Sequence, residues 1–232
     1  MITMALRIGL MLFPRVQQLD LTGPYEVFAM LPDCQVDLVA RTMQPVATAT
    51  GLTLMPTTTF ETCGAYDVLC VPGGVGITPL LKDGDALDFV RRQAGTARYV
   101  TSVCTGALLL GAAGLLRGRR ATTHWNALDL LPLYGAEAVR ERVVQDGNLI
   151  TGGGVTAGID FALTLAGEIF GHEAAQAVQL QLEYAPAPPY NAGTPDGAPL
   201  TVVAKVRARL EGVRAEREDI VRRKRRLTDI IE

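Results

Sequence analysis

The sequence has few residues of the kinds that bind metals or cross-link chains. Only two histidines occur, His124 and His172, which leaves few nitrogen ligands for a transition metal, and we predict no metal site. The four cysteines have no CxxC spacing, so neither a zinc site nor a disulfide framework is indicated. In a reducing compartment each cysteine would be a free thiol.

The sequence also has no long apolar run and no strong net charge. No stretch reaches about 18 consecutive apolar residues, and the N-terminus lacks the charged start and cleavage site of a signal peptide. We therefore expect a cytoplasmic protein with no membrane partner. The formal net charge of −2 gives no general reason to expect a nucleic-acid partner. The length of 232 residues fits one α/β domain with a tail.

Short apolar runs that alternate with helical patterns indicate the fold class. Strands are expected at 6–13, 35–40, 66–71 and 99–103, and helices at 24–31, 85–94, 107–116 and 157–170. This alternation predicts an α/β protein whose mostly parallel central sheet is covered by helices on both faces. Ligands of such sheets bind beyond the carboxyl ends of the strands, so the functional residues should lie there.

Cys104 lies at the junction between a predicted strand and a predicted helix. A side chain at such a nucleophile elbow meets the first turn of the helix, where free N–H groups and the helix dipole favour an anion, so a lowered thiol pKa is expected. A cysteine can also be a small buried hydrophobe. We accept that interpretation for Cys34, Cys63 and Cys70, whereas the position of Cys104 favours a nucleophile.

A nucleophile needs a proton carrier and polar neighbours. Asp20, in the apolar stretch QQLDLTGP, suits a carboxyl group whose pKa is raised by burial, although it could instead cap a helix that starts near Pro24. Gly73 and Gly74 follow a strand and could offer backbone N–H groups to a substrate or an intermediate. Thr105 could bond a substrate or Asp20, or only complete the helix start.

Two further features adjoin these candidates. A Cys–His pair with His124 is an alternative, but a histidine followed by Trp125 is more often structural, with a ring nitrogen bonded to a backbone carbonyl. The stretch TGGGVTAG has no lysine and lacks the spacing of a phosphate-binding loop. We interpret it as a tight strand-to-helix connection near the site, with Val155 as a candidate substrate contact.

The C-terminal part differs in composition from the rest. Residues 182–199 are rich in proline and should run extended over a surface. Residues 201–232 return to a helical pattern with ten basic and six acidic residues, a charge of +4. A nucleic-acid contact is one interpretation of this charge. We favour an amphipathic helix docked on the body or on a second subunit through Val203, Val206, Leu210 and Val213.

Together these motifs resemble the ThiJ/PfpI superfamily over residues 6–190. The resemblance is carried by LFPRVQQLDLTGP, VPGG, TSVCTGALLLGAAGLL, RATTHW and TGGGVTAGIDFALTLA. It implies a flavodoxin-like three-layer α/β sandwich with a nucleophile elbow. Residues 1–190 would form the catalytic domain, and residues 191–232 a mainly helical extension packed on the body or on a dimer partner.

Within the superfamily, the motifs are most similar to the branch that hydrates isocyanides. By that resemblance Cys104 would be the nucleophile, Asp20 the general acid and base, Thr105 a hydrogen-bonding neighbour, and Gly73 or Gly74 backbone donors. Protease-like members have histidine after the cysteine, and deglycase-like members have glutamate where Asp20 stands, so those activities are less expected.

The resemblance implies a hydro-lyase that adds water to an isocyanide and releases an N-substituted formamide through a covalent thioimidate. Such an enzyme needs no metal or organic cofactor, and a homodimer is expected. The alternative is a non-catalytic redox or small-molecule sensor, related to the sensor domains of AraC-type regulators. About 32 residues follow the proline-rich segment, too few for the paired helix-turn-helix motifs of such regulators.

Overall fold

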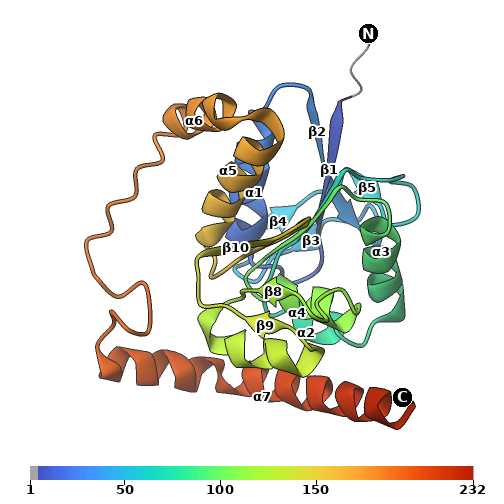
Figure 1. Ribbon diagram of the computed structural model, residues 1–232, viewed down its shortest axis with the longest axis vertical. Helices are drawn as coiled ribbons and strands as arrows, with labels where there is room; N and C mark the ends of the chain where they lie inside the picture. Colours follow the sequence, from blue (N-terminus) through green and yellow to red (C-terminus); the bar gives the residue numbers. More distant parts are fainter. Residues whose placement is uncertain (1–4, 232) are drawn as a thin grey trace.

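A seven-stranded sheet forms the centre of the protein, in a computed structural model that describes residues 5–231 except the side chains of residues 225 and 227–231 (Figure 1). All neighbouring strands are parallel apart from one antiparallel pair at an edge, β10 with β11. The inner strands follow the flavodoxin-like order, which confirms the predicted fold class. In order across the sheet, the strands are β10 (Val143–Asp146), β11 (Leu149–Gly152), β7 (Tyr99–Val103), β6 (Val68–Val71), β1 (Leu6–Met11), β2 (Cys34–Ala40) and β5 (Thr58–Thr59).

Helices cover both faces of this sheet and make the outer two layers (Figure 1). One layer holds α1 (Gln18–Ala29), α5 (Ala157–Phe170) and α6 (His172–Gln181), and the other holds α2 (Ile77–Leu80), α3 (Gly84–Ala94) and α4 (Gly106–Ala112). A 3-10 helix, η1 (Trp125–Tyr134), packs beside α4. Two small strand pairs lie outside the main sheet, β3 (Val46–Ala47) with β4 (Thr53–Leu54), and β8 (Arg120–Ala121) with β9 (Glu137–Ala138).

The four predicted strands are present as β1, β2, β6 and β7. They could be recognised in the sequence because strands covered by helices on both faces are apolar along their whole length. Every residue of β6 and of β7 is buried. The prediction for the first helix was wrong at its start: α1 begins at Gln18, and Pro24 lies inside it. Asp20 therefore belongs to the first turn of α1 and does not cap a later helix. The alternative role of Asp20 as a helix cap is thereby excluded.

The proline-rich segment leads from α6 at one end of the molecule to the last helix at the other end (Figure 1). The chain has no regular element after α6 until α7 (Leu200–Ile231), which runs along the base of the molecule against η1 and α2 (Figure 1). Ile220 and Val221 of α7 are buried. Val206 is 38% exposed, so it does not dock on the body of this chain, and its place on a face that meets a second subunit stays a prediction.

The division of the chain at residue 190 stays a prediction, and its outermost residues, 1–4 and 232, lie outside the described residues. None of the helices described within residues 5–231 is both long and apolar enough to span a membrane.

Candidate active site

Cys104 has a backbone conformation that is unusual for a residue with a side chain. It joins β7 to α4 with a φ of +54°, in the left-handed region. Its backbone N–H donates to the carbonyl oxygens of Gly152 (3.0 Å) and Gly153 (2.8 Å), and its own carbonyl accepts a hydrogen bond from Thr123 Oγ1 (2.6 Å). These three bonds hold the strained turn in place and fix the direction of the thiol.

Asp20 is completely buried beside this thiol. Its Oδ2 accepts a hydrogen bond from the backbone N–H of Gly73 at 2.9 Å. Burial raises the pKa of Asp20 to about 7, although the hydrogen bonds with Gly73 and Cys104 oppose the rise. A carboxyl group with this pKa can both accept and release a proton near neutral pH, as a general acid and base must.

The thiol of Cys104 differs from the expectation drawn from its helix position. Burial, and then the negative charge of Asp20, raise the pKa of Cys104 well above its usual value. The Thr105 N–H at the start of α4 and the guanidinium of Arg217 lower the pKa, but they do not outweigh the other two causes. The predicted lowering was therefore wrong, and the folded protein favours the protonated form of the thiol.

The loop after β6 joins Asp20 to Thr105. The Gly74 N–H donates to Thr105 Oγ1 at 3.1 Å, while the Gly73 N–H donates to Asp20. Thr105 occupies the N-cap position of α4, but its side chain forms no capping bond there. Both glycine N–H groups are thus engaged by protein side chains, and their main effect is to position Asp20 and Thr105.

Gly73→Ala should disable this arrangement, because a methyl group on Gly73 would lie 2.6 Å from Thr105 N and 2.8 Å from Asp20 Oδ2. Displacing reacting groups by about 1 Å can cost on the order of a hundredfold in rate. We expect kcat for the reaction proposed below to fall by about that factor. Gly84→Ala is the matched control, since a methyl group there meets nothing within 4 Å. Equal kcat values for both variants would contradict this role of Gly73.

A cavity of about 200 Å³ opens in front of Cys104. Of the predicted site residues, Cys104, Thr105, Gly74 and Val155 line it, whereas Asp20 and Gly73 lie behind them. Most of the other lining side chains are apolar: Ala49, Val75, Ala127, Leu130, Leu210 and Val213. The last two belong to α7, so the C-terminal helix forms one wall of the cavity.

His124 also lines the cavity but does not form a Cys–His pair. Its Nδ1 accepts a hydrogen bond from the backbone N–H of Asn126 (3.3 Å), not the predicted type of bond to a backbone carbonyl. Burial, and then the charge of Arg217, lower the pKa of His124 to about 4, so the ring is neutral at pH 7. Among the described residues, no hydrogen bond joins His124 to Cys104. We assign the ring to the wall of the cavity.

Sequence reasoning missed two residues of the site. Thr123 holds the Cys104 carbonyl, and Arg217 reaches the site from α7. Thr123 stands in the quoted motif RATTHW, whereas Arg217 is one of many basic residues in the tail and carries no local signal. Within residues 5–231, no group of three or more His, Cys, Asp or Glu side chains is arranged to hold a metal ion.

Comparisons with known proteins identify the family of this chain. The model of the DJ-1/PfpI family matches residues 6–168. An isonitrile hydratase of Pseudomonas putida is 66% identical over 206 residues, which cover 89% of this chain and 90% of that protein. The crystal structure of a ThiJ/PfpI family protein from Pseudomonas syringae has a TM-score of 0.91 at 38% identity, covering 94% of this chain and 90% of the other.

A likeness to regulators is weaker and partial. An HTH-type transcriptional regulator of Pseudomonas aeruginosa is 32% identical over 58% of this chain, and the match covers 37% of the regulator. The resemblance to the ThiJ/PfpI superfamily, inferred from the motifs, is confirmed over most of the length. On the family match and on the agreement in fold, the chain belongs to the DJ-1/PfpI family.

Proposed function

We propose that this protein is an isocyanide hydratase, which converts an isocyanide (isonitrile) and water into an N-substituted formamide. The observation that carries the proposal is the thiol of Cys104 at a small apolar cavity, with the buried carboxyl of Asp20 beside it. An isocyanide has no hydrogen-bond donor, so an apolar cavity of this size suits it. The 66% identity to an isonitrile hydratase supports the same reaction.

In the first half of the reaction, Cys104 adds to the terminal carbon of R–N≡C. Asp20 accepts the thiol proton as the sulfur attacks, and then delivers that proton to the same carbon. A C–S bond and a C–H bond form, and the product is the thioimidate Cys104–S–CH=N–R. The raised pKa of Asp20 suits both transfers, because the carboxyl exchanges protons near neutral pH.

In the second half, water adds across the C=N bond of the thioimidate. Asp20 takes a proton from the water as its oxygen bonds to carbon, and the nitrogen gains that proton. The C–S bond then breaks, the hydroxyl proton passes through Asp20 to the sulfur, and HC(=O)–NH–R leaves. Substrate and water supply all atoms of the product, so no step uses a metal or an organic cofactor.

The remaining site residues have supporting roles in this proposal. Thr105 and the backbone at Gly73 and Gly74 hold Asp20 beside Cys104, and Val155 contacts the R group from the cavity wall. We also expect a cytoplasmic homodimer. Size-exclusion chromatography with light scattering tests the dimer, which a monomeric mass at micromolar concentration would contradict.

The direct test is turnover of para-nitrophenyl isocyanide by the purified protein, followed by absorbance, with the product identified by mass spectrometry. We expect the corresponding formamide, and a quenched reaction in which the peptide with Cys104 gains the mass of one isocyanide. The absence of formamide, together with reversible oxidation of Cys104 by peroxide, would instead favour the sensor function. The raised pKa of the buried thiol argues against such a sensor, because oxidation follows thiolate character and exposure.

A further inference from the structure

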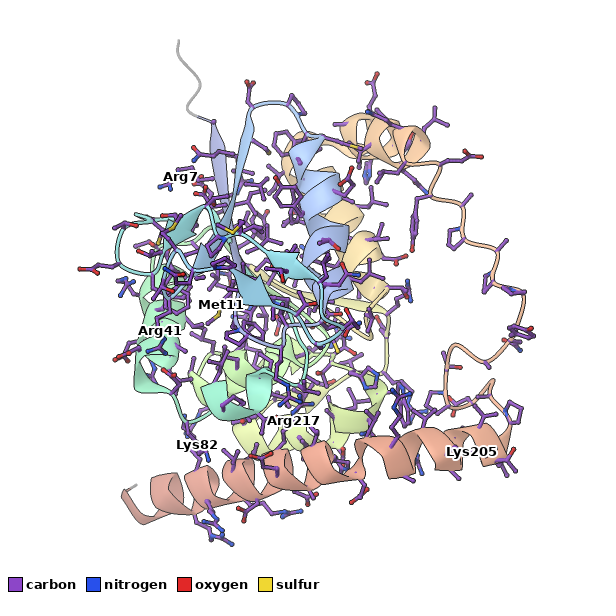
Figure 2. The ribbon with its side chains drawn as sticks, turned by 180° about the vertical axis from the view of Figure 1, so that it is seen from behind. Arg7, Met11, Arg41, Lys82, Lys205 and Arg217 are labelled. Carbon is purple, nitrogen blue, oxygen red and sulfur yellow. The ribbon has the colours of Figure 1, made fainter. Side chains whose placement is uncertain are left out.

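Arg217 is a buried cation that lies next to the site but belongs to the last helix. Its residue exposure is 8%, and in Figure 2 it points from α7 into the body of the protein. Its Nε donates to Thr78 Oγ1 at 3.0 Å and its Nη2 donates to the Gly74 carbonyl at 2.6 Å. The guanidinium therefore joins α7 to α2 and to the loop that positions Asp20 and Thr105.

This burial needs an explanation, because a cation removed from water is costly unless an anion compensates it. Arg214, one turn earlier on α7, pairs with Asp129 and with Glu218. Arg217 forms no such pair with a carboxylate among the residues whose side chains are described. Burial lowers the pKa of Arg217, and the groups that oppose this lowering are the Cys104 sulfur, when it is ionised, and then Glu216.

We propose that Arg217 is a positioning residue of the reaction, which clamps the Gly74 carbonyl from α7 and places its positive charge where the Cys104 thiolate develops. Two separate observations support the two parts of this role, the hydrogen bond and the charge. The hydrogen bond to Gly74 holds the loop whose N–H groups fix Asp20 and Thr105. The charge lines the same cavity as Cys104 and favours its ionised sulfur.

Four other ionisable groups, in the cavity wall or close behind it, surround Cys104 and Arg217. Asp20 opposes ionisation of Cys104, whereas Arg217 favours it. His124 is held neutral, and Arg217 is one cause. Glu216, the neighbour of Arg217 on α7, favours the charged guanidinium, and Arg214 lines the cavity with its charge shared by two carboxylates. Removing Arg217 therefore leaves burial and the charge of Asp20, which both disfavour the thiolate, less opposed.

The test measures alkylation of Cys104 by iodoacetamide from pH 6 up to the highest pH at which the circular dichroism spectrum stays native, followed by peptide mass spectrometry so that the other thiols do not interfere. For Arg217→Gln we expect the rate at pH 8 to fall about tenfold and the pH midpoint to rise by about one unit, the usual effect of losing a nearby opposite charge. This measurement does not depend on isocyanide turnover, so it stands even if the proposed function fails.

Arg217→Lys separates the charge from the clamp, because lysine keeps the cation but lacks the fork that reaches Thr78 and Gly74 together. We expect its alkylation midpoint to return close to that of the wild type, while kcat stays about tenfold lower, the loss of one charged hydrogen bond. Arg223→Gln is the matched control, because Arg223 lies on the same helix with a side chain that is 71% exposed. It should match the wild type in both measurements.

Two results would overturn the proposal. One is a folded Arg217→Gln protein, with a wild-type circular dichroism spectrum, whose alkylation midpoint and rate equal those of the wild type. If that variant does not fold, Arg217→Lys decides the question, and a wild-type kcat in it would exclude the clamp.

Discussion

Cys104→Ala is expected to reduce formamide production to the background rate and to abolish the mass gain on the peptide that contains residue 104. The thiol is the group that attacks the isocyanide carbon in the proposed reaction, and without it no thioimidate forms for water to attack. Loss of a nucleophile typically costs several orders of magnitude in kcat. Turnover assays and mass spectrometry of the quenched reaction check this expectation.

The fold should survive this substitution. Alanine at a φ of +54° is strained to a similar degree as cysteine, so the left-handed turn is neither relieved nor made worse. Cys34→Ser is the matched control, because Cys34 is a partly exposed thiol at the start of β2, away from the cavity. Full activity of a folded Cys104→Ala protein would rule out the covalent mechanism.

Asp20→Asn should lower kcat by about a hundredfold to ten-thousandfold, the usual contribution of a positioned general acid or base. The amide oxygen can still accept the Gly73 N–H, so the loop keeps its geometry, but the side chain no longer carries a proton between sulfur, carbon and water. A kcat within threefold of the wild type would show that another group moves the proton. The dependence of kcat on pH between pH 5 and pH 9 also tests the mechanism. The change in kcat near pH 7 that the wild type owes to ionisation of Asp20 should be absent from the variant.

The same substitution should stabilise the fold at neutral pH. In the unfolded chain the carboxyl ionises near its usual pKa of 3.8, whereas in the folded protein it ionises near 7. The unfolded state therefore binds fewer protons between these values, and the free energy of unfolding of the wild type falls as the pH rises from about 4 to about 7. Over this pH range the free energy of unfolding of the wild type should fall by an amount on the order of 4 kcal/mol. We expect the Tm of Asp20→Asn to exceed that of the wild type only slightly at pH 4 and most above pH 7. The opposite trend in thermal unfolding would contradict the raised pKa of Asp20.

The sequence predicted the sheet better than it predicted the helices. Strands β1, β2, β6 and β7 were visible because both faces of a parallel sheet are covered, which makes each strand an apolar run. The start of α1 was not visible, since Pro24 is typical of a first helical turn but here lies in the helix interior. Short segments such as η1 and α6 depend on tertiary packing and gave no clear pattern.

The sequence predicted which residues lie close to Cys104 better than it predicted the pKa of the Cys104 thiol. Cys104, Thr105, Gly74 and Val155 share one cavity, and Asp20 lies beside the thiol, as motif positions at strand ends suggested. The pKa of the thiol could not be predicted, because it depends on how deeply the turn is buried and on the separation of two groups far apart in the sequence. Arg217 could not be identified for the same reason.

At position 104 the left-handed backbone conformation favours glycine, whereas the proposed reaction requires a cysteine. A residue with a Cβ atom loses roughly 1–2 kcal/mol in that region relative to glycine, so the turn itself favours glycine there. Copies of this fold that have lost the need for a thiol should therefore drift towards glycine or asparagine at the position. A cysteine retained at this turn is evidence of selection for its sulfur. The sequence of a relative therefore indicates whether that relative uses the thiol before its activity has been measured.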